Sequence, residues 1–383
     1  MHAPHPALEL ADILRDHAPA YAEQHPLTGF QERAIRAIVA CRTPALGGQV
    51  FHCPACGHDE VRFHSCGNRH CPKCQSLAKD RWVAAQVAEV LPVEYFHIVF
   101  TLPHAINVLT PTSVVDNLLF ACASQTLLDF ARDPKWLGAE PAITMILHTW
   151  DQRLLVHRHV HCLVSGGGLT AEGEWKNAKT HFLFPVRALS RVFRGKFMEA
   201  LAAGLDQGKL HLPPEVQRDA LLAKLTRSDW VVYAKRPFAG PEQVLAYLGR
   251  YTHRTAIGNQ RLVSLEAGVV RFRWRDRAHG NVVRVMALPA AAFIHRFLLH
   301  VLPKGFQRIR HYGLLANRHK AERLARAREA LALPPPEPVV KESVEDFALR
   351  VLGVDIHLCP VCHEGRMRLV ATVPRIRGPP DHG

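Results

Sequence analysis

The segment "VHRHVHCLVSGGG", residues 156–168, places His157, His159 and His161 on alternate positions of a predicted β-strand. Because side chains alternate between the two faces of a strand, the three histidines share one face. The opposite face carries Val156, Arg158, Val160 and Cys162. Same-face neighbours on a strand lie about 6–7 Å apart, which lets two imidazoles converge on one metal ion. We therefore predict a metal-binding histidine pair here, with surface or hydrogen-bonded histidines as the alternative, and a turn at the glycines 166–168.

The whole chain has the composition of a basic globular protein of 383 residues. Its 48 Lys and Arg against 34 Asp and Glu give a net charge of +14, which favours phosphate-rich partners, with solubility as the alternative. The N-terminus lacks the pattern of a signal peptide, and no run of about 18 apolar residues occurs, so we expect a cytoplasmic location. Ten cysteines in such a chain indicate metal ligands or free thiols rather than disulfides.

Hydrophobic periodicity and turn residues predict helices and strands mixed along the chain. Helices are expected over residues 7–21, 28–41, 75–90, 113–131, 188–225, 241–251 and 289–302. Strands are expected over residues 94–103, 142–150, 159–164 and 228–235, with a hairpin over 268–288. Thr28 and Gln31 predict a capping box at the start of the second helix. The segment "LALPPPEPVVKE", residues 331–342, predicts a proline-rich linker.

A second motif, "AYLGRYTHRT" at residues 246–255, carries two tyrosines and two arginines at helical spacing. Tyr247 and Tyr251 share one face of the predicted helix, and Arg250 and Arg254 repeat this spacing beside them. A tyrosine hydroxyl with a pKa near 10 is a poor nucleophile at neutral pH, but a divalent metal can polarise a phosphate for its attack. Histidines and tyrosines together therefore indicate covalent phosphodiester cleavage. Packing at a helix interface is the alternative for the tyrosine pair.

Three motifs in order carry a family resemblance: "HVHCLVSGGG" (159–168), "YLGRYTHRTAIGN" (247–259) and "RIRHYGLLANRHK" (308–320). Together they resemble the rolling-circle transposases of bacterial insertion sequences, the two-tyrosine type of insertion-sequence family ninety-one. These belong to the HUH endonuclease superfamily, in which U is a hydrophobic residue. The strand "FHIVFTLP" (96–103) also resembles the first motif of that superfamily. The resemblance extends from the cysteine cluster to about residue 320.

The resemblance implies a catalytic metal, Mg²⁺ or Mn²⁺, on His159 and His161, with Val160 as the U. It also implies that Tyr247 and Tyr251 attack single-stranded DNA, each giving a 5′-phosphotyrosine and a free 3′-hydroxyl. The energy of the broken bond is kept in that linkage, so strand transfer needs no ATP.

The resemblance also implies a third, polar metal ligand near the histidine pair. Our first choice is Gln152, in the predicted turn before the histidine strand, and the alternatives are His157 and His148. The sequence does not decide between these three residues.

Two Cys-x-x-Cys pairs lie 14 residues apart: Cys53 with Cys56, and Cys71 with Cys74. Such pairs predict one tetrahedral zinc site, in which Cys66 or His70 is a substitute for one of the four thiolates. The resemblance implies the same N-terminal zinc-binding domain, with a role in recognising or placing DNA ends.

The other cysteines form one further pair and three single residues. Cys359 and Cys362 make a third pair, for which His357, His363 or a partner chain are candidate further ligands. Two unliganded thiols are the alternative. The remaining three are interpreted as small buried apolar residues, namely Cys41, Cys122 and Cys162.

The segment 304–328 is rich in Lys and Arg interleaved with aromatic residues, which favours contacts to phosphates and bases, with a solvated helix face as the alternative. The residues we expect at DNA are Arg250, Arg254, Arg308, Arg310, Arg318 and Lys320. In "RFRWRDR" (271–277) the arginines alternate with Phe272 and Trp274, so one face of that strand is cationic and the other apolar.

These observations predict an α+β protein of three consecutive parts. They are N-terminal helices with a zinc-binding module (1–90), an HUH domain (91–331), and a linker with a C-terminal tail (332–383). For the HUH domain the resemblance implies a mostly antiparallel central sheet flanked by helices. The predicted function is metal-dependent nicking and strand transfer of element ends and target DNA, with a homo-oligomer left open. The alternatives are a plasmid or phage replication initiator and a non-catalytic zinc-containing DNA-binding regulator.

Overall fold

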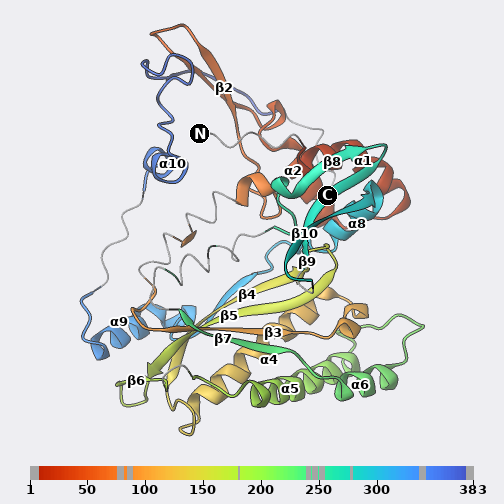
Figure 1. Ribbon diagram of the computed structural model, residues 1–383, viewed down its shortest axis with the longest axis vertical. Coiled ribbons are helices and arrows are strands. Elements are labelled where there is room, and N and C mark those ends of the chain that lie inside the picture. Colours follow the sequence, from red (N-terminus) through yellow and green to blue (C-terminus); the bar gives the residue numbers. More distant parts are fainter. Residues whose placement is uncertain are drawn as a thin grey trace. The chain divides into compact units, whose positions relative to one another are not determined.

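The computed structural model describes residues 8–75, 82–83, 89–179, 182–238, 243, 249, 255–276, 279–335 and 342–376. They form two compact units, each assembled from separate stretches of chain (Figure 1). Unit 1 draws on residues within 1–82, 253–301 and 338–383, and unit 2 on residues within 83–252 and 302–337. This division differs from the three consecutive parts predicted, because residues 253–301 and the C-terminal tail join the N-terminal module.

Unit 2 is built on an antiparallel sheet with the strand order β11-β4-β5-β3-β7, and β6 pairs with β5. The strands are β3 (Tyr95–Thr101), β4 (Glu140–Trp150), β5 (Val156–Leu169), β6 (Trp175–Asn177), β7 (Val232–Phe238) and β11 (Ile309–Gly313). Every one of these pairings is antiparallel, which confirms the predicted sheet type. The histidine strand β5 lies between β4 and β3, near the centre of the sheet.

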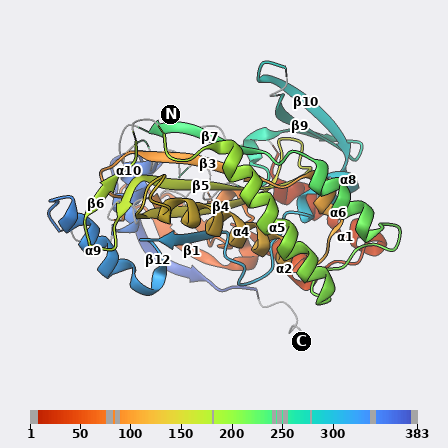
Figure 2. The same ribbon diagram turned by 90° about the horizontal axis from the view of Figure 1, so that it is seen from below.

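Helices cover one face of this sheet. They are α4 (Thr112–Arg132), α5 (Val186–Asp206) and α6 (Arg218–Arg227), and Figure 2 shows α4 and α5 lying across the strands. Their apolar side chains meet those of the strands in the main core, where the rings of Phe100 and Phe193 lie 4.8 Å apart. Among the described residues α4 is the one helix long and apolar enough to cross a membrane, and it packs in this core. Unit 2 also contains η2 (His104–Val108), η4 (Asn317–His319) and α9 (Lys320–Ala330).

The glycines 166–168 are not the turn that the sequence predicted, because β5 continues through them to Leu169. A β-carbon on Gly167 would lie 2.8 Å from the carbonyl oxygen of Lys176, and one on Gly168 would lie 2.6 Å from that of Glu140. The glycines therefore allow neighbouring backbones to approach closely within the sheet. The turn prediction was wrong because a glycine run fits a crowded strand as well as a turn.

In its described residues, unit 1 combines the helices α1 (Leu10–Gln24), α2 (Gly29–Ala40), α8 (Ala290–Leu298) and α10 (Val344–Leu352) with two small sheets. Helix α1 contacts both α2 and α8. One sheet has the order β10-β9-β8, from β8 (Leu262–Glu266), β9 (Val269–Asp276) and β10 (Val282–Pro289). The other has the order β12-β1-β2, from β1 (Gly48–His52), β2 (Asp59–Phe63) and β12 (Arg368–Val373). Shorter elements are η1 (Pro44–Leu46) and η3 (Asn259–Arg261).

Local sequence signals predicted most element positions. The capping box at Thr28 is present, since its N–H donates to the side chain of Gln31 at 3.0 Å. The β9–β10 hairpin is confirmed, and Phe272 lies in the core while Arg273 is exposed on the other face. The single helix predicted over 188–225 is two helices, α5 and α6. The helices predicted over 75–90 and 241–251 fall mostly outside the described residues.

Candidate functional site

The pairing of β4 with β5 brings three histidines together on the face of the sheet opposite α4 and α5. His148 on β4 lies directly across from His159 on β5, and Ile146 lies across from His161. The side-chain nitrogens of His148, His159 and His161 lie within 4.8 Å of one another. The alternation predicted for β5 is confirmed, because Arg158 and Val160 are buried and the three histidines of the strand are half-buried.

Hydrogen bonds and ring contacts orient these imidazoles. Nδ1 of His159 lies 2.8 Å from the backbone oxygen of His157, so a proton on Nδ1 directs the Nε2 lone pair outward. His161 shares a hydrogen bond of 2.9 Å between its Nδ1 and Nε2 of His97, whose ring is stacked on it. The ring of His148 stacks on Trp150 at 4.9 Å. The cluster is therefore held by contacts beyond its three members.

His97 comes from β3 and lies next to the cluster. Its side chain is buried on the histidine face, because residues 97, 99 and 101 of β3 share that face with His159 and His161. Burial, together with the charge of Lys235, lowers the pKa of His97 to about 4. A neutral imidazole can accept a hydrogen bond at Nε2 from the Nδ1–H of His161.

The opposite face of β5 is fixed by a buried ion pair. Nε of Arg158 donates to Asp116 of α4 at 3.1 Å, and the side chains are 4% and 1% exposed. The guanidinium also donates to Asn107 at 2.7 Å, and Asn107 donates to the backbone oxygen of Val156. Burial raises the pKa of Asp116 to about 6, against the opposing effect of Arg158. These contacts hold β5 to α4 directly behind the histidines.

The donor set suits a transition metal. Imidazoles are ligands for divalent first-row ions, and three protein ligands would leave coordination by water or a substrate oxygen possible, as in catalytic metal sites. Of the three candidates for third ligand, His148 joins the pair, whereas His157 is not grouped with it. Gln152 lies in the turn between β4 and β5, where the backbone of residues 153 and 155 donates to Asp151. Tyr247, Tyr251, Arg250 and Arg254 lie outside the described residues.

The cysteines form two groups rather than the single zinc site predicted. One group is Cys41, Cys66, Cys71 and Cys74, and the other is Cys53, Cys56, Cys359 and Cys362. The two predicted Cys-x-x-Cys pairs thus belong to different groups, and Cys41 is not the isolated apolar residue that we expected. Cys122 and Cys162 are in the main core, as predicted.

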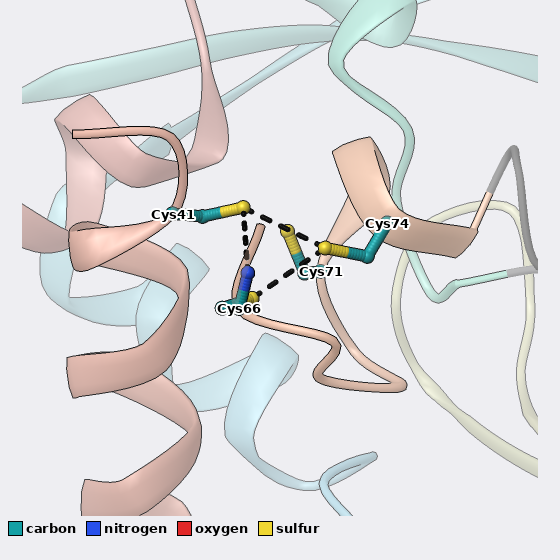
Figure 3. A group of neighbouring side chains, drawn as sticks. All are labelled: Cys41, Cys66, Cys71 and Cys74. Atoms are coloured by element: carbon teal, nitrogen blue, oxygen red, sulfur yellow. Dashed lines mark hydrogen bonds between the residues drawn. The ribbon is translucent and has the colours of Figure 1, made fainter. Parts of the chain in front are cut away.

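The first group has the geometry of a tetrahedral thiolate site (Figure 3). Sγ of Cys74 lies 3.6 Å from Sγ of Cys41 and 3.6 Å from Sγ of Cys66. Four sulfurs at about 2.3 Å from one zinc ion would be about 3.8 Å apart, so these distances fit zinc. The N–H of Asn68 donates to Cys66 Sγ at 3.4 Å, a contact that favours a thiolate. His70, named as an alternative ligand, is buried beside this group but is not grouped with it.

Several basic residues expected at DNA have partners within the protein. Arg308 is 8% exposed, so, contrary to the expectation, burial leaves little of its side chain for contact with DNA. Arg310 on β11 stacks over Phe120 at 4.1 Å and donates to Asn117. Lys320 pairs with Glu89. Arg318 is exposed.

Comparisons with known proteins fit both parts of this geometry. A family model described as "Transposase zinc-binding domain" matches residues 13–102, and one described as "Putative transposase" matches residues 142–323. The chain is 47% identical over 386 residues to "Putative transposase y4qJ" of Sinorhizobium fredii, covering 97% of each chain. The chain belongs to the two-tyrosine transposase family of insertion sequences of the family ninety-one type.

A second relative supports the same membership. The chain is 29% identical over 354 residues to "Transposase for insertion sequence element IS801" of Pseudomonas savastanoi pv. phaseolicola. The aligned residues cover 89% of this chain and 83% of that relative. No solved structure matches the chain. A member of this family is an enzyme that acts on DNA, and its zinc-binding domain accounts for the N-terminal cysteines.

Sequence reasoning missed two contributors to these sites. Cys41 caps the second helix and belongs to no Cys-x-x-Cys pair, and only its position beside the 66–74 loop identifies it. An available signal was the unpaired Cys66, which indicates a partner elsewhere. His97 lies within a quoted motif, and the alternation of β3 would have placed it on the histidine face.

Proposed function

We propose that this protein nicks and rejoins single-stranded DNA at the ends of a mobile element through covalent tyrosine intermediates. The observation that carries the proposal is the convergence of His148, His159 and His161 on one sheet face, in a chain of the transposase family. Partly burying three imidazoles has a desolvation cost that apolar side chains at the same positions would avoid, which supports a functional role for the cluster.

Tyr247 and Tyr251 are the nucleophiles in this proposal. The hydroxyl oxygen of one tyrosine attacks the phosphorus atom, the bond from phosphorus to the 3′ oxygen breaks, and the tyrosine proton goes to that oxygen. The products are a 5′-phosphotyrosine and a free 3′-hydroxyl, so the number of phosphoester bonds is unchanged. The second tyrosine repeats this step at the other end, and a 3′-hydroxyl reverses it during joining.

The histidine cluster would hold the divalent cation of the reaction. When bound, the cation supplies Lewis-acid polarisation of the scissile phosphate. We propose His148 in place of Gln152 as the third ligand, because it lies opposite His159 across the β4–β5 pair. Imidazole donors suit Mn²⁺ and later transition metals better than Mg²⁺, which prefers oxygen ligands, so of the two ions expected we favour Mn²⁺.

The group Cys41, Cys66, Cys71 and Cys74 would hold a structural zinc ion. Its sulfur distances and buried position support this assignment, and zinc there would join the end of α2 to the 66–74 loop. We propose the element ends and the target DNA as the substrates, on the basis of the proposed reaction and the net charge of +14. We expect this reaction in the cytoplasm.

A nicking assay on labelled single-stranded DNA with Mn²⁺ tests the cluster. We expect His148→Ala, His159→Ala and His161→Ala each to lower the nicking rate by at least about 100-fold while DNA binding is kept. His157→Ala is the matched control on the same strand and is expected to retain activity. If Gln152→Ala abolishes nicking while His148→Ala does not, the third-ligand assignment is wrong.

Trapping of the covalent intermediate tests the nucleophiles. Each of Tyr247→Phe and Tyr251→Phe removes only the hydroxyl oxygen, and either single variant can still cleave one strand. The double variant is expected to give no protein–DNA adduct on a denaturing gel. An adduct formed by the double variant, or full nicking in the presence of EDTA, would refute the proposed mechanism.

A further inference from the structure

The second cysteine group joins the first and last parts of unit 1. Cys53 and Cys56 lie between β1 and β2, whereas Cys359 and Cys362 precede β12, and 303 residues separate Cys56 from Cys359. We propose that these four residues hold a second structural zinc ion, separate from the first, that fixes the C-terminal tail to the N-terminal sheet. This site goes beyond the proposed function, and residues 359–362 lie outside both family models.

The sulfur positions fit one tetrahedral ion. Sγ of Cys53 lies 3.8 Å from Sγ of Cys362, and Sγ of Cys56 lies 3.7 Å from Sγ of Cys359. These distances match the edge of about 3.8 Å for four thiolates around zinc, and they are far longer than a disulfide bond of about 2.05 Å. All four side-chain sulfurs lie within 4.8 Å of one another.

The two Cys-x-x-Cys turns have the same backbone form. After the first, the N–H of Gly57 donates to the oxygen of Cys53 at 2.9 Å, and the φ angle of Gly57 is 76°. After the second, the N–H of His363 donates to the oxygen of Cys359 at 3.1 Å, with a φ angle of 57°. A non-glycine residue in this left-handed region is uncommon, so the tail adopts the strained turn that its counterpart forms with glycine.

Gly365 permits the tail to pack against the first pair. A β-carbon at this position would lie 2.3 Å from Sγ of Cys53 and 2.7 Å from the β-carbon of Ala55. The N–H of Gly365 also donates to Sγ of Cys362 at 3.3 Å, as expected for a hydrogen bond that stabilises a thiolate. Glycine at position 365 therefore allows the backbone of the tail to approach the four cysteine sulfurs closely.

Apolar packing around the site is too small to hold the tail by itself. β12 pairs with β1 from Gly48↔Val373 to His52↔Arg368, but its side chains Leu369 and Val370 are 52% and 58% exposed. The local core consists of Cys53, Cys359 and Met367, with Phe51 and Cys362 partly buried. A module with so little buried apolar surface needs another source of stability, and structural zinc supplies folding free energy directly.

The zinc content of the purified full chain, measured by mass spectrometry, tests the proposal. We expect two zinc ions per chain for the unaltered protein and one for the double variant Cys56→Ser with Cys362→Ser, whose thiols are the more accessible of the group. The single zinc ion kept by that variant shows that the first site is still folded. Cys122→Ser, in the main core, is the control and should retain two.

Other results of this measurement would overturn the proposal. A content of one zinc ion in both the unaltered protein and the double variant would mean that the second group holds none. Two ions in both would mean that the second zinc ion is held elsewhere. The variant Cys56→His keeps a zinc-ligating side chain and is expected to retain two ions, whereas a loss there would show that packing rather than ligation is involved.

Hydrogen exchange tests whether the zinc ion fixes the tail. In the double variant we expect the amides of residues 368–373 to exchange at least about 10-fold faster than in the unaltered protein, because their pairing with β1 loses its anchor. The amides of residues 269–276, in the other sheet of unit 1, should exchange at an unchanged rate. Slow exchange of 368–373 in a variant that has lost one zinc ion would contradict the anchoring role.

Discussion

At the scale of single residues, the histidine face depends on side chains that would not themselves bind the metal. His97 shares a hydrogen bond with His161 at 2.9 Å and stacks on its ring, so it is a positioning residue. We expect His97→Ala to weaken the apparent metal affinity in nicking by about 10- to 100-fold. His97→Gln can still make a hydrogen bond and should recover part of that loss.

A metal titration of the nicking rate measures this effect. A purely structural role for His97 would lower the amount of folded enzyme at every metal concentration without moving the midpoint. An unchanged midpoint in His97→Ala would therefore contradict the positioning role.

Removing one partner of the ion pair behind the histidines is expected to destabilise unit 2, because the other charge stays buried. Asp116→Ala would leave the charge of Arg158 buried, with Asn107 as its remaining hydrogen-bond partner among the described residues, and we expect a loss of about 3–5 kcal/mol. Asp129→Ala on the same helix is the matched control, because its pair with Lys196 is exposed to solvent. That control should lose at most about 1 kcal/mol. Urea denaturation of both variants measures the difference, and equal losses would refute the argument.

At the scale of elements, backbone spacing decides how β11 joins the sheet. Gly313 ends β11 with a φ angle of 60°, and a β-carbon there would lie 2.0 Å from the backbone oxygen of Pro141. Gly313→Ala therefore combines left-handed strain of about 1–2 kcal/mol with a clash that breaks the β11–β4 pairing. Gly305 has a φ angle of 81° and open space around it, so Gly305→Ala carries the strain alone.

Chemical denaturation of these two glycine variants separates clash from strain. We expect Gly313→Ala to be less stable than Gly305→Ala by at least about 2 kcal/mol, since overpacking adds to the shared backbone term. Similar midpoints for the two variants would show that the sheet relaxes around the new methyl group.

At the scale of the whole molecule, the net charge of +14 predicts that binding to single-stranded DNA weakens steeply with salt. The exposed Arg318 is the residue of the basic segment that we expect to contact phosphate. Arg318→Ala should reduce the log–log salt slope by about 0.7, the value for one phosphate contact on a single strand. Arg191→Ala removes the same charge from the exposed surface of α5 and should leave the slope unchanged. Equal slopes for both variants would contradict a local contact.

The sequence by itself determined the local features of this protein. Alternation in "VHRHVH" defined the two faces of β5, and the capping box at Thr28 defined the start of α2, because both depend on neighbours within a few residues. The ordered motifs were sufficient to predict the family. The α+β class and the antiparallel sheet followed from that resemblance.

Tertiary structure alone decided which distant residues meet. The sequence paired Cys53 and Cys56 with Cys71 and Cys74 because these lie close along the chain, yet each pair has its partners elsewhere. Sequence spacing fixes the geometry within a Cys-x-x-Cys turn but not the partner of that turn, which depends on strand pairing across 303 residues. The position of His148 beside the histidine pair was open for the same reason, since only the register of β4 against β5 brings residue 148 opposite His159.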